Sequence, residues 1–252
     1  MSSFNYTFLN LAAQSPTIEL ALSVTDKIQN EKKLNQVFYV CNSALKSCSV
    51  NIKNKKSICR LCISKAQSGI NLYKKKNNNV TVKYINRSDL VNYNNDIDPT
   101  TYKDLLLGVN STIASQFRIR DIHKLEKKWM KYHEKMLDSS LGLFKFFEKE
   151  INQRKPDSFV VFNGRLSCSR PVKTLSIKYK LDYYLFDSSF NGNFPILAKN
   201  QMFHSIEFAR KTALTSYIKN FTVSHFTAKK FMNAKLNKKI VNDKVYTSHQ
   251  KK

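Results

Sequence analysis

The chain has 252 residues, of which 42% are hydrophobic, and it carries a formal net charge of +25 at pH 7. This hydrophobic content is enough for the core of one large or two small domains, and it excludes an intrinsically disordered chain. No stretch reaches the apolar length of a transmembrane helix, and the amino terminus lacks the basic region of a secretory signal. We therefore expect a cytoplasmic protein.

The positive charge is carried mainly by lysine. Lysine greatly outnumbers arginine, asparagine is abundant, and both are expected from AT-rich coding DNA. The lysine-rich segments 53–56 and 74–76 lack the interleaved arginine and aromatic residues of a base-stacking surface. The charge therefore predicts a solvated surface with a weak attraction to acidic membrane lipid rather than a nucleic-acid partner.

The first third of the chain predicts strands separated by helices. Residues 5–12 form the first predicted strand, and a helix starts at Ser15-Pro16 and extends to about Ile28. Residues 36–41 and 80–85 are predicted strands, and residues 88–95 read as a polar loop. The order is βαβ(α)β, in which the helix between the second and third strands has no predicted bounds.

Four cysteines follow the second predicted strand closely, at Cys41, Cys48, Cys59 and Cys62. Cytoplasmic thiols stay reduced, so a disulfide framework is not expected. One interpretation is a structural Zn²⁺ or an iron–sulfur centre held by these four thiolates, because two residues between Cys59 and Cys62 is the usual half-site spacing. The alternative is that Cys41, at a strand end, is packed as a small hydrophobe. Cys168 lies apart and is expected to be structural.

The middle of the chain is helical. A first helix is predicted over 104–118 and a longer one over 121–153, which Gly142 divides in two. His123 and His133 fall on the longer helix without metal or triad spacing, and a solvated helix face is the expected place for both.

Residues 155–189 predict a complete βαβ crossover. The all-apolar run 159–162 is typical of a parallel strand covered on both faces. Asn163, Gly164 and Arg165 then turn at its carboxyl end, where α/β sheets bind ligands. Asn163 is therefore a candidate ligand contact, although an Asn-Gly pair is equally typical of a plain turn.

The helix of this crossover starts near Ser169, a candidate cap, with Pro171 in its first turn. Residues 182–187 form the next strand, residues 191–195 form a loop, and helices are predicted over 201–219 and 227–236. The stripe expected to face the sheet consists of Val172, Leu175, Ile177 and Tyr179.

Two further polar side chains are candidates at the same edge of the sheet. Asp187 ends a strand and could act as a general base or orient a hydroxyl, and its alternative role is to cap a loop. His204 follows the 191–195 loop and could face the same edge, and its alternative is an ordinary residue at the start of a helix.

Several of these segments together resemble a known family. They are V-F-Y-V-C-N-S-A-L-K-S-C followed by C-R-L-C, the D-L-L-L-G-V helix, P-D-x-x-x-V-F-N-G-R with a downstream R-P, and the terminal K-V-Y-T-S-H-Q. The combination resembles the amino-terminal half of bacterial capsular and surface polysaccharide biosynthesis proteins of the GT-B glycosyltransferase type. The resemblance implies a Rossmann-like α/β domain, a parallel sheet flanked by helices, that holds the sugar acceptor.

The resemblance implies an acceptor-side domain over 1–220, with a cysteine-containing insertion at 41–62, and a helical linker over 221–252 leading to a second domain. It also implies that Asn163 and Arg165 position a glycan or lipid-linked acceptor, that Arg170 contacts an anion and that Asp187 is the base. In GT-B enzymes a nucleotide-sugar donor is generally held by the second domain. This chain has no G-x-G-x-x-G or G-K-[ST] motif for donor phosphates, so we expect no transfer by this half alone.

Two other functions stay open on the sequence. The charge and the clustered thiols fit a non-catalytic nucleic-acid-binding protein with a four-cysteine metal site, although the βαβ pattern and the shortage of arginine count against it. A chain without a donor-binding half also fits an inactive glycan-binding or scaffold domain of a membrane-associated synthesis complex.

Overall fold

The computed structural model describes residues 3–90, 97–119, 121–122, 125–188, 195–202, 205–219 and 221–237. Its centre is a six-stranded sheet with the strand order β3-β2-β1-β4-β5-β6. The strands are β1 (Phe4–Leu9), β2 (Asn35–Cys41), β3 (Val80–Ile85), β4 (Ser158–Phe162), β5 (Asp182–Ser188) and β6 (Pro195–Lys199). Neighbouring strands from β3 to β5 pair in parallel, and β6 pairs antiparallel with β5. The predicted Rossmann-like α/β class is confirmed.

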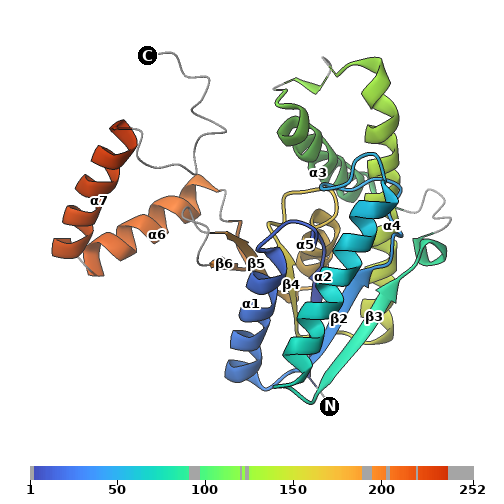
Figure 1. The fold of residues 1–252 in the computed structure, drawn as a ribbon, viewed down its shortest axis with the longest axis horizontal. Coiled ribbons are helices and arrows are strands. Elements are labelled where there is room, and N and C mark those ends of the chain that lie inside the picture. The colour runs from blue at the N-terminus through green and yellow to red at the C-terminus, as the bar shows by residue number, and fades with distance from the viewer. Residues whose placement is uncertain are drawn as a thin grey trace.

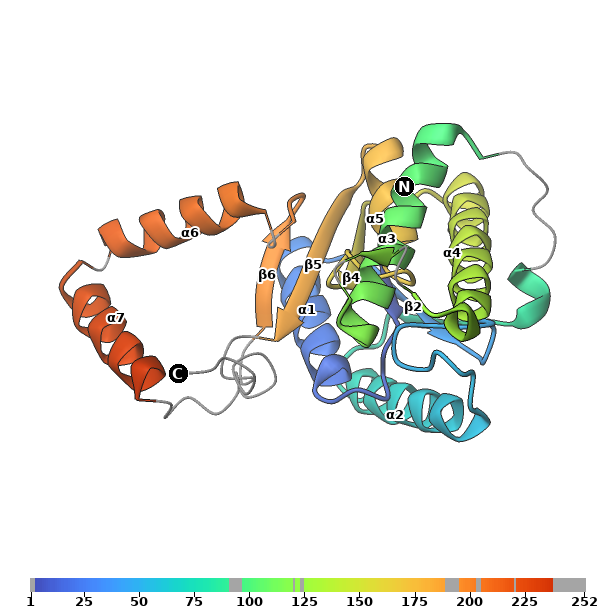
Figure 2. The ribbon, with the colours of Figure 1, turned by 90° about the horizontal axis from the view of Figure 1, so that it is seen from above.

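Helices cover both faces of the sheet (Figures 1 and 2). One face carries α1 (Thr17–Lys32) and α2 (Lys56–Lys74), and the other carries α3 (Pro99–Phe117), α4 (Lys127–Gln153) and α5 (Arg170–Lys178). The strand order reverses between β1 and β4, and right-handed crossovers therefore place the two sets of helices on opposite faces. A short 3-10 helix, η1 (Arg87–Leu90), follows β3.

The two faces of β1 bury different chemistry. On the α4 face, the rings of Tyr6 and Tyr39 meet edge to face at 5.1 Å, and Phe147 of α4 lies at the same distance from Tyr39. On the α1 face, Asn5 donates to Gln36 at 2.7 Å, and Thr7 shares a hydrogen bond with Thr25 of α1. Aromatic packing thus anchors one helical layer, and a buried polar network fixes the register on the other face.

The structure corrects several sequence predictions in the first half of the chain and in the long helix. β1 ends at Leu9, because Leu11 takes a left-handed backbone conformation with φ of 63°. The helix predicted to start at Asp104 begins at Pro99, where the Asp98 side chain caps it. Gly142 does not divide α4 but lets it pass close to η1, since a Cβ there would stand 3.1 Å from the Cβ of Leu90.

Further corrections fall around the crossover. Ile177 is 55% exposed instead of facing the sheet, whereas Val172 and Leu175 are fully buried. Ser169 occupies the N-cap position of α5 without a capping hydrogen bond, since its hydroxyl donates to the carbonyl of Leu166. The strand β6 was not predicted. The loops at 91–95 and 191–194 lie outside the described residues.

Three helices end unusually. Lys33 after α1, Arg118 after α3 and Lys180 after α5 take left-handed conformations with φ of 51°, 53° and 53°. Glycine is the common residue at such ends because it has no Cβ to clash. The chain has five glycines in all, and Gly164 is the single described glycine with a positive φ.

The chain continues beyond β6 into α6 (Ile206–Lys219) and α7 (Phe221–Leu236). Both views show this pair of helices projecting away from the layers around the sheet (Figures 1 and 2). Among the described residues, no helix is both long enough and apolar enough to cross a membrane.

Candidate functional site

The candidate site lies at the carboxyl ends of the parallel strands. In sheets of this topology, ligands bind where the strand order reverses, which here is between β1 and β4. Leu11 follows β1 and Asn163 follows β4, and both have φ of 63°. Non-glycine residues in this region carry backbone strain, and such strain clusters at functional sites. The two turns that flank the reversal point therefore mark this edge as the place to look for a ligand.

The structure brings Asn163 and Asp187 together. They end the adjacent strands β4 and β5, and the Asn163 side-chain amide donates to the Asp187 carboxylate at 2.6 Å. The backbone N–H of Ser188 donates to the other carboxylate oxygen at 2.8 Å. These two bonds fix the orientation of the carboxylate, while each oxygen keeps a lone pair for a ligand hydroxyl. Asp187 is thus better arranged to orient a hydroxyl than to act as an unencumbered base.

Arg165 belongs to the same turn. Its backbone N–H donates to the Asn163 side-chain oxygen at 3.2 Å, and its guanidinium donates from Nη1 to Ser111 of α3 at 3.0 Å. The Nε atom of Arg165 is buried without a hydrogen-bond acceptor, and no described carboxylate forms an ion pair with this side chain. A guanidinium in this state retains donors for an anion or a ligand oxygen.

Arg170 is committed elsewhere. Its Nε donates to Asp104 of α3 at 3.1 Å, and a second guanidinium nitrogen pairs with the other carboxylate oxygen. Thr174 also donates to Asp104, and Lys173 stands 4.0 Å from it. Burial raises the pKa of Asp104, but the bonds from Arg170 and Thr174 and the charge of Lys173 outweigh it, so the pKa lies below its usual range. Arg170 therefore joins α5 to α3 with its charge paired to Asp104, and its implied role as an anion contact stays a prediction.

The turn between Arg165 and α5 is also fixed. The N–H of Ser167 donates to the Thr112 hydroxyl at 2.8 Å, and Gly108 lets Arg170 pack against α3, since a Cβ there would stand 2.9 Å from the Arg170 Cβ. Sequence reasoning missed Asp104, Ser111 and Thr112. The signal for Ser111 and Thr112 was the polar run N-S-T directly after the apolar run L-L-L-G-V of this helix. His204 and His123 lie outside the described residues.

His133 is not on a solvated face. It is half-buried, and its Nε2 lies 2.8 Å from the side-chain oxygen of Asn110 on α3. Burial lowers its pKa. This contact joins α4 to α3.

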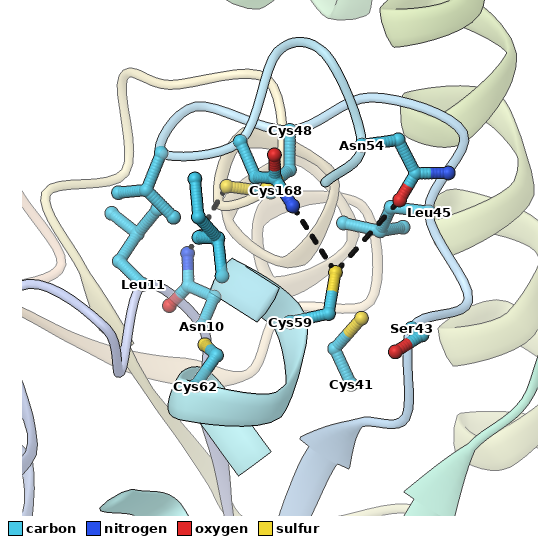
Figure 3. Close-up of a pocket in the computed structure, with 13 residues that line it drawn as sticks. Asn10, Leu11, Cys41, Ser43, Leu45, Cys48, Asn54, Cys59, Cys62 and Cys168 are labelled. Carbon is cyan, nitrogen blue, oxygen red and sulfur yellow. Dashed lines mark hydrogen bonds between the residues drawn. The ribbon is translucent and has the colours of Figure 1, made fainter. Parts of the chain in front are cut away.

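The cysteines gather around a pocket at the carboxyl ends of β1 and β2 (Figure 3). All five thiols line it, including Cys168, which the sequence had set apart from the other four. Asn51 donates to the Cys59 sulfur at 3.2 Å, and Asn10 donates to the Cys168 sulfur at 3.4 Å. The side-chain oxygen of Asn10 is buried without a partner. The pocket thus lies at the same edge of the sheet as the Asn163 turn, which follows β4.

The thiol pocket is small, and burial raises the pKa of three of its five thiols. Its cavity volume is about 30 Å³, which is room for a single water molecule and not for a sugar. Burial raises the pKa of Cys41 to about 11 and raises those of Cys48 and Cys62 above the ordinary value.

The expected metal site rests on the same thiols. Although Cys59 and Cys62 lie one helical turn apart on α2, no three described His, Cys, Asp or Glu side chains are arranged to hold a metal ion. The four-cysteine metal site therefore stays a prediction, and so does its alternative, in which Cys41 is packed as a small hydrophobe.

No family model matches the chain. No curated protein matches it either. Among solved structures, the chain is similar to a CDPS from Fluoribacter dumoffii, with 11% identity and a TM-score of 0.46 over 78% of this chain and 90% of that one. It is also similar to a Leishmania major tyrosyl-tRNA synthetase in complex with tyrosinol, with 12% identity and a TM-score of 0.42.

That second match covers 91% of this chain but 36% of the synthetase, so the chain spans about a third of that protein. The same synthetase in complex with fisetin gives 9% identity, a TM-score of 0.39 and coverage of 96% and 39%. Likeness at this level concerns the α/β fold and carries nothing about activity.

Proposed function

We propose that the chain is the acceptor-side domain of a glycosyltransferase of surface polysaccharide synthesis, and that it holds a phosphate-bearing sugar acceptor at the carboxyl ends of β4 and β5. The observation that carries the proposal is the state of the Arg165 side chain. The Nε atom of Arg165 is buried without a hydrogen-bond acceptor. Arg165 belongs to the turn that also supplies Asn163, the hydrogen-bond donor to Asp187. A cation in the turn after β4 and a fixed carboxylate at the end of the adjacent strand β5 match a ligand with an anionic group and a hydroxyl.

The proposed roles follow from the hydrogen bonds. Asp187 would accept the hydrogen bond of an acceptor hydroxyl, and Asn163 keeps the carboxylate in place for it. Arg165, held by Ser111, would bind the phosphate of a lipid-linked or phosphorylated acceptor. Positioning a hydroxyl against an activated donor is a large part of what a transferase contributes to the rate. The nucleotide-sugar donor is assigned to a second domain, as in the family that the sequence resembles.

The test is binding of N-acetylglucosamine 1-phosphate to the full chain, measured by titration calorimetry beside N-acetylglucosamine and inorganic phosphate. We expect saturable binding of the sugar phosphate. Arg165→Ala should weaken it by about ten- to a hundredfold, because a charge-assisted hydrogen bond is worth about 1.5–3 kcal/mol. Asp187→Asn should weaken binding of the sugar phosphate and leave inorganic phosphate unaffected.

The matched control is Arg60→Ala, which removes an exposed arginine of α2. It should bind like the wild type. Equal affinity of Arg165→Ala and the wild type, or no saturable binding of the sugar phosphate by a folded wild-type chain, would refute the assignment.

A further inference from the structure

The two last helices form a hairpin of their own. Phe221 opens α7, and its ring contacts that of Tyr217 on α6 edge to face at 5.1 Å and stacks on His225 at 6.5 Å. These rings join the helices at their turn. Near its start, α6 lines a pocket with Tyr183 and Asn200 at the sheet edge. Beyond that point both helices project from the body of the molecule (Figures 1 and 2).

Apolar side chains on this hairpin are exposed to an unusual degree. Half of the large hydrophobic residues that the described part of the chain exposes lie in α6 and α7. Scattered single exposed hydrophobes are ordinary, but a concentration of them on one element marks an interaction surface. They are Ile206, Leu214, Tyr217, Ile218, Phe221, Phe226, Met232 and Leu236, and Phe226 and Leu236 are 70% and 75% exposed.

The same helices are strongly basic. Together they contain six lysine or arginine residues and a single acidic residue, Glu207. Five of these cations are exposed, and none of the five is in an ion pair with a described carboxylate. They are Arg210, Lys211, Lys219, Lys229 and Lys230.

Cations and apolar side chains are neighbours on each helix. Leu214 follows Arg210 and Lys211 by one helical turn, and Phe226 precedes Lys229 and Lys230 by one turn. Each of these two exposed apolar groups is therefore a neighbour of two cationic residues on the surface of its helix. A lipid bilayer with anionic headgroups can accept both kinds of side chain, because aliphatic and aromatic groups can enter its apolar layer while cations contact the headgroups.

We propose that the α6–α7 hairpin docks the protein on an anionic lipid bilayer. Charge complementarity favours this partner over a second copy of the chain, because two hairpins with the same excess of cations repel each other. It also favours lipid over nucleic acid, which would leave the aliphatic groups of Ile218 and Met232 uncovered. With 14 and 16 residues, each helix is shorter than the roughly 20 residues that span a bilayer, so the hairpin lies along the surface.

The experiment is co-sedimentation of the full chain with phosphatidylcholine vesicles that contain about one third phosphatidylserine. Near such an anionic surface each basic residue contributes about 1 kcal/mol to the binding free energy. Purely phosphatidylcholine vesicles serve as the neutral comparison. We expect binding to the anionic vesicles that falls steeply with salt, and little binding to the neutral ones.

Two variants separate the contribution of the cations to vesicle binding from that of the apolar side chains. Lys229→Glu with Lys230→Glu should weaken binding by at least about twentyfold, since each cation near an acidic surface contributes about fivefold. Phe226→Ser with Ile218→Ser should weaken it while leaving the net charge unchanged. The matched control is Lys74→Glu with Lys75→Glu at the exposed end of α2, which changes the net charge equally and should cost less than about threefold.

Three outcomes would overturn the proposal. The first is equal loss of vesicle binding in the α2 control and the α7 variant, which would make the attraction a property of total charge. The second is a dimer in sedimentation velocity that Phe226→Ser dissociates, in a chain that binds no vesicles. The third is binding to single-stranded RNA without binding to anionic vesicles. Circular dichroism confirms that each variant is folded, and none of these outcomes bears on the sugar-phosphate site.

Discussion

A methyl group added at Gly164 should destabilise the turn that carries the proposed site. Gly164 has φ of 71°, and a Cβ built on it would stand 2.6 Å and 2.8 Å from the two terminal methyl carbons of Leu185. The left-handed conformation costs an alanine about 1–2 kcal/mol. Leu185 is fully buried, so its methyl groups have no free space to enter, and the overpacking adds about 1–3 kcal/mol.

These terms are reduced by about 0.5–1 kcal/mol, because alanine restricts the unfolded chain more than glycine does. Gly164→Ala should therefore lower the free energy of unfolding by about 2–4 kcal/mol, which for a chain of this size is roughly 5–15 °C in Tm. Urea and thermal denaturation followed by circular dichroism measure the change.

A double-mutant cycle with Leu185→Ala isolates the clash. That substitution alone removes a buried leucine and should cost about 2–5 kcal/mol. In its background the added methyl has space, and Gly164→Ala should cost about 1 kcal/mol, the part that is due to φ. Equal costs of Gly164→Ala in the two backgrounds would refute the steric argument, and no cost in either would refute the left-handed turn as well.

Asp104→Asn should destabilise the chain by about 3 kcal/mol near neutral pH, because it leaves Arg170 and Lys173 without their carboxylate. The pKa of Asp104 is lowered in the folded state, so its contribution is complete above the unfolded pKa of about 3.9 and is lost as the pH falls further. The difference between the variant and the wild type should therefore shrink below about pH 4, and a difference independent of pH in urea denaturation would contradict this origin. At pH 8 a thiol reagent should modify Cys41 and Cys48 slowly in the native protein and all five cysteines rapidly in denaturant, since desolvation raises the pKa of these two partly exposed thiols. EDTA should leave Tm unchanged, and a large fall in Tm on chelation would mean that the thiols close around a metal in solution.

The sequence predicted those helices, strands and turns whose pattern lies within a few neighbouring residues. The apolar run 159–162 and the Asn-Gly turn after it are confirmed as β4 and a left-handed turn. Pro171 lies in the first turn of α5 as expected. β6 escaped prediction because its pairing partner β5, and not its own pattern, makes it a strand.

Part of the candidate site could likewise be predicted from the sequence, and part of it could not. Asn163 and Asp187 follow strand ends, and the geometry of a parallel sheet is enough to bring them together. The partner of Arg170 depends on how α3 packs against α5, and no sequence spacing encodes that contact. The approach of Cys168 to the four earlier cysteines likewise arises from the folding of distant segments, more than a hundred residues apart.

The left-handed residues that follow α1, α3 and α5 are positions at which the thermal stability of this fold could be raised. Lys33, Arg118 and Lys180 occupy conformations in which a side chain is disfavoured by about 1–2 kcal/mol, whereas glycine is not. They lie at helix ends and not in the Asn163–Asp187 pair. Substituting glycine at these three positions should therefore give a variant with a higher Tm and leave the Asn163–Asp187 pair and the thiol pocket intact.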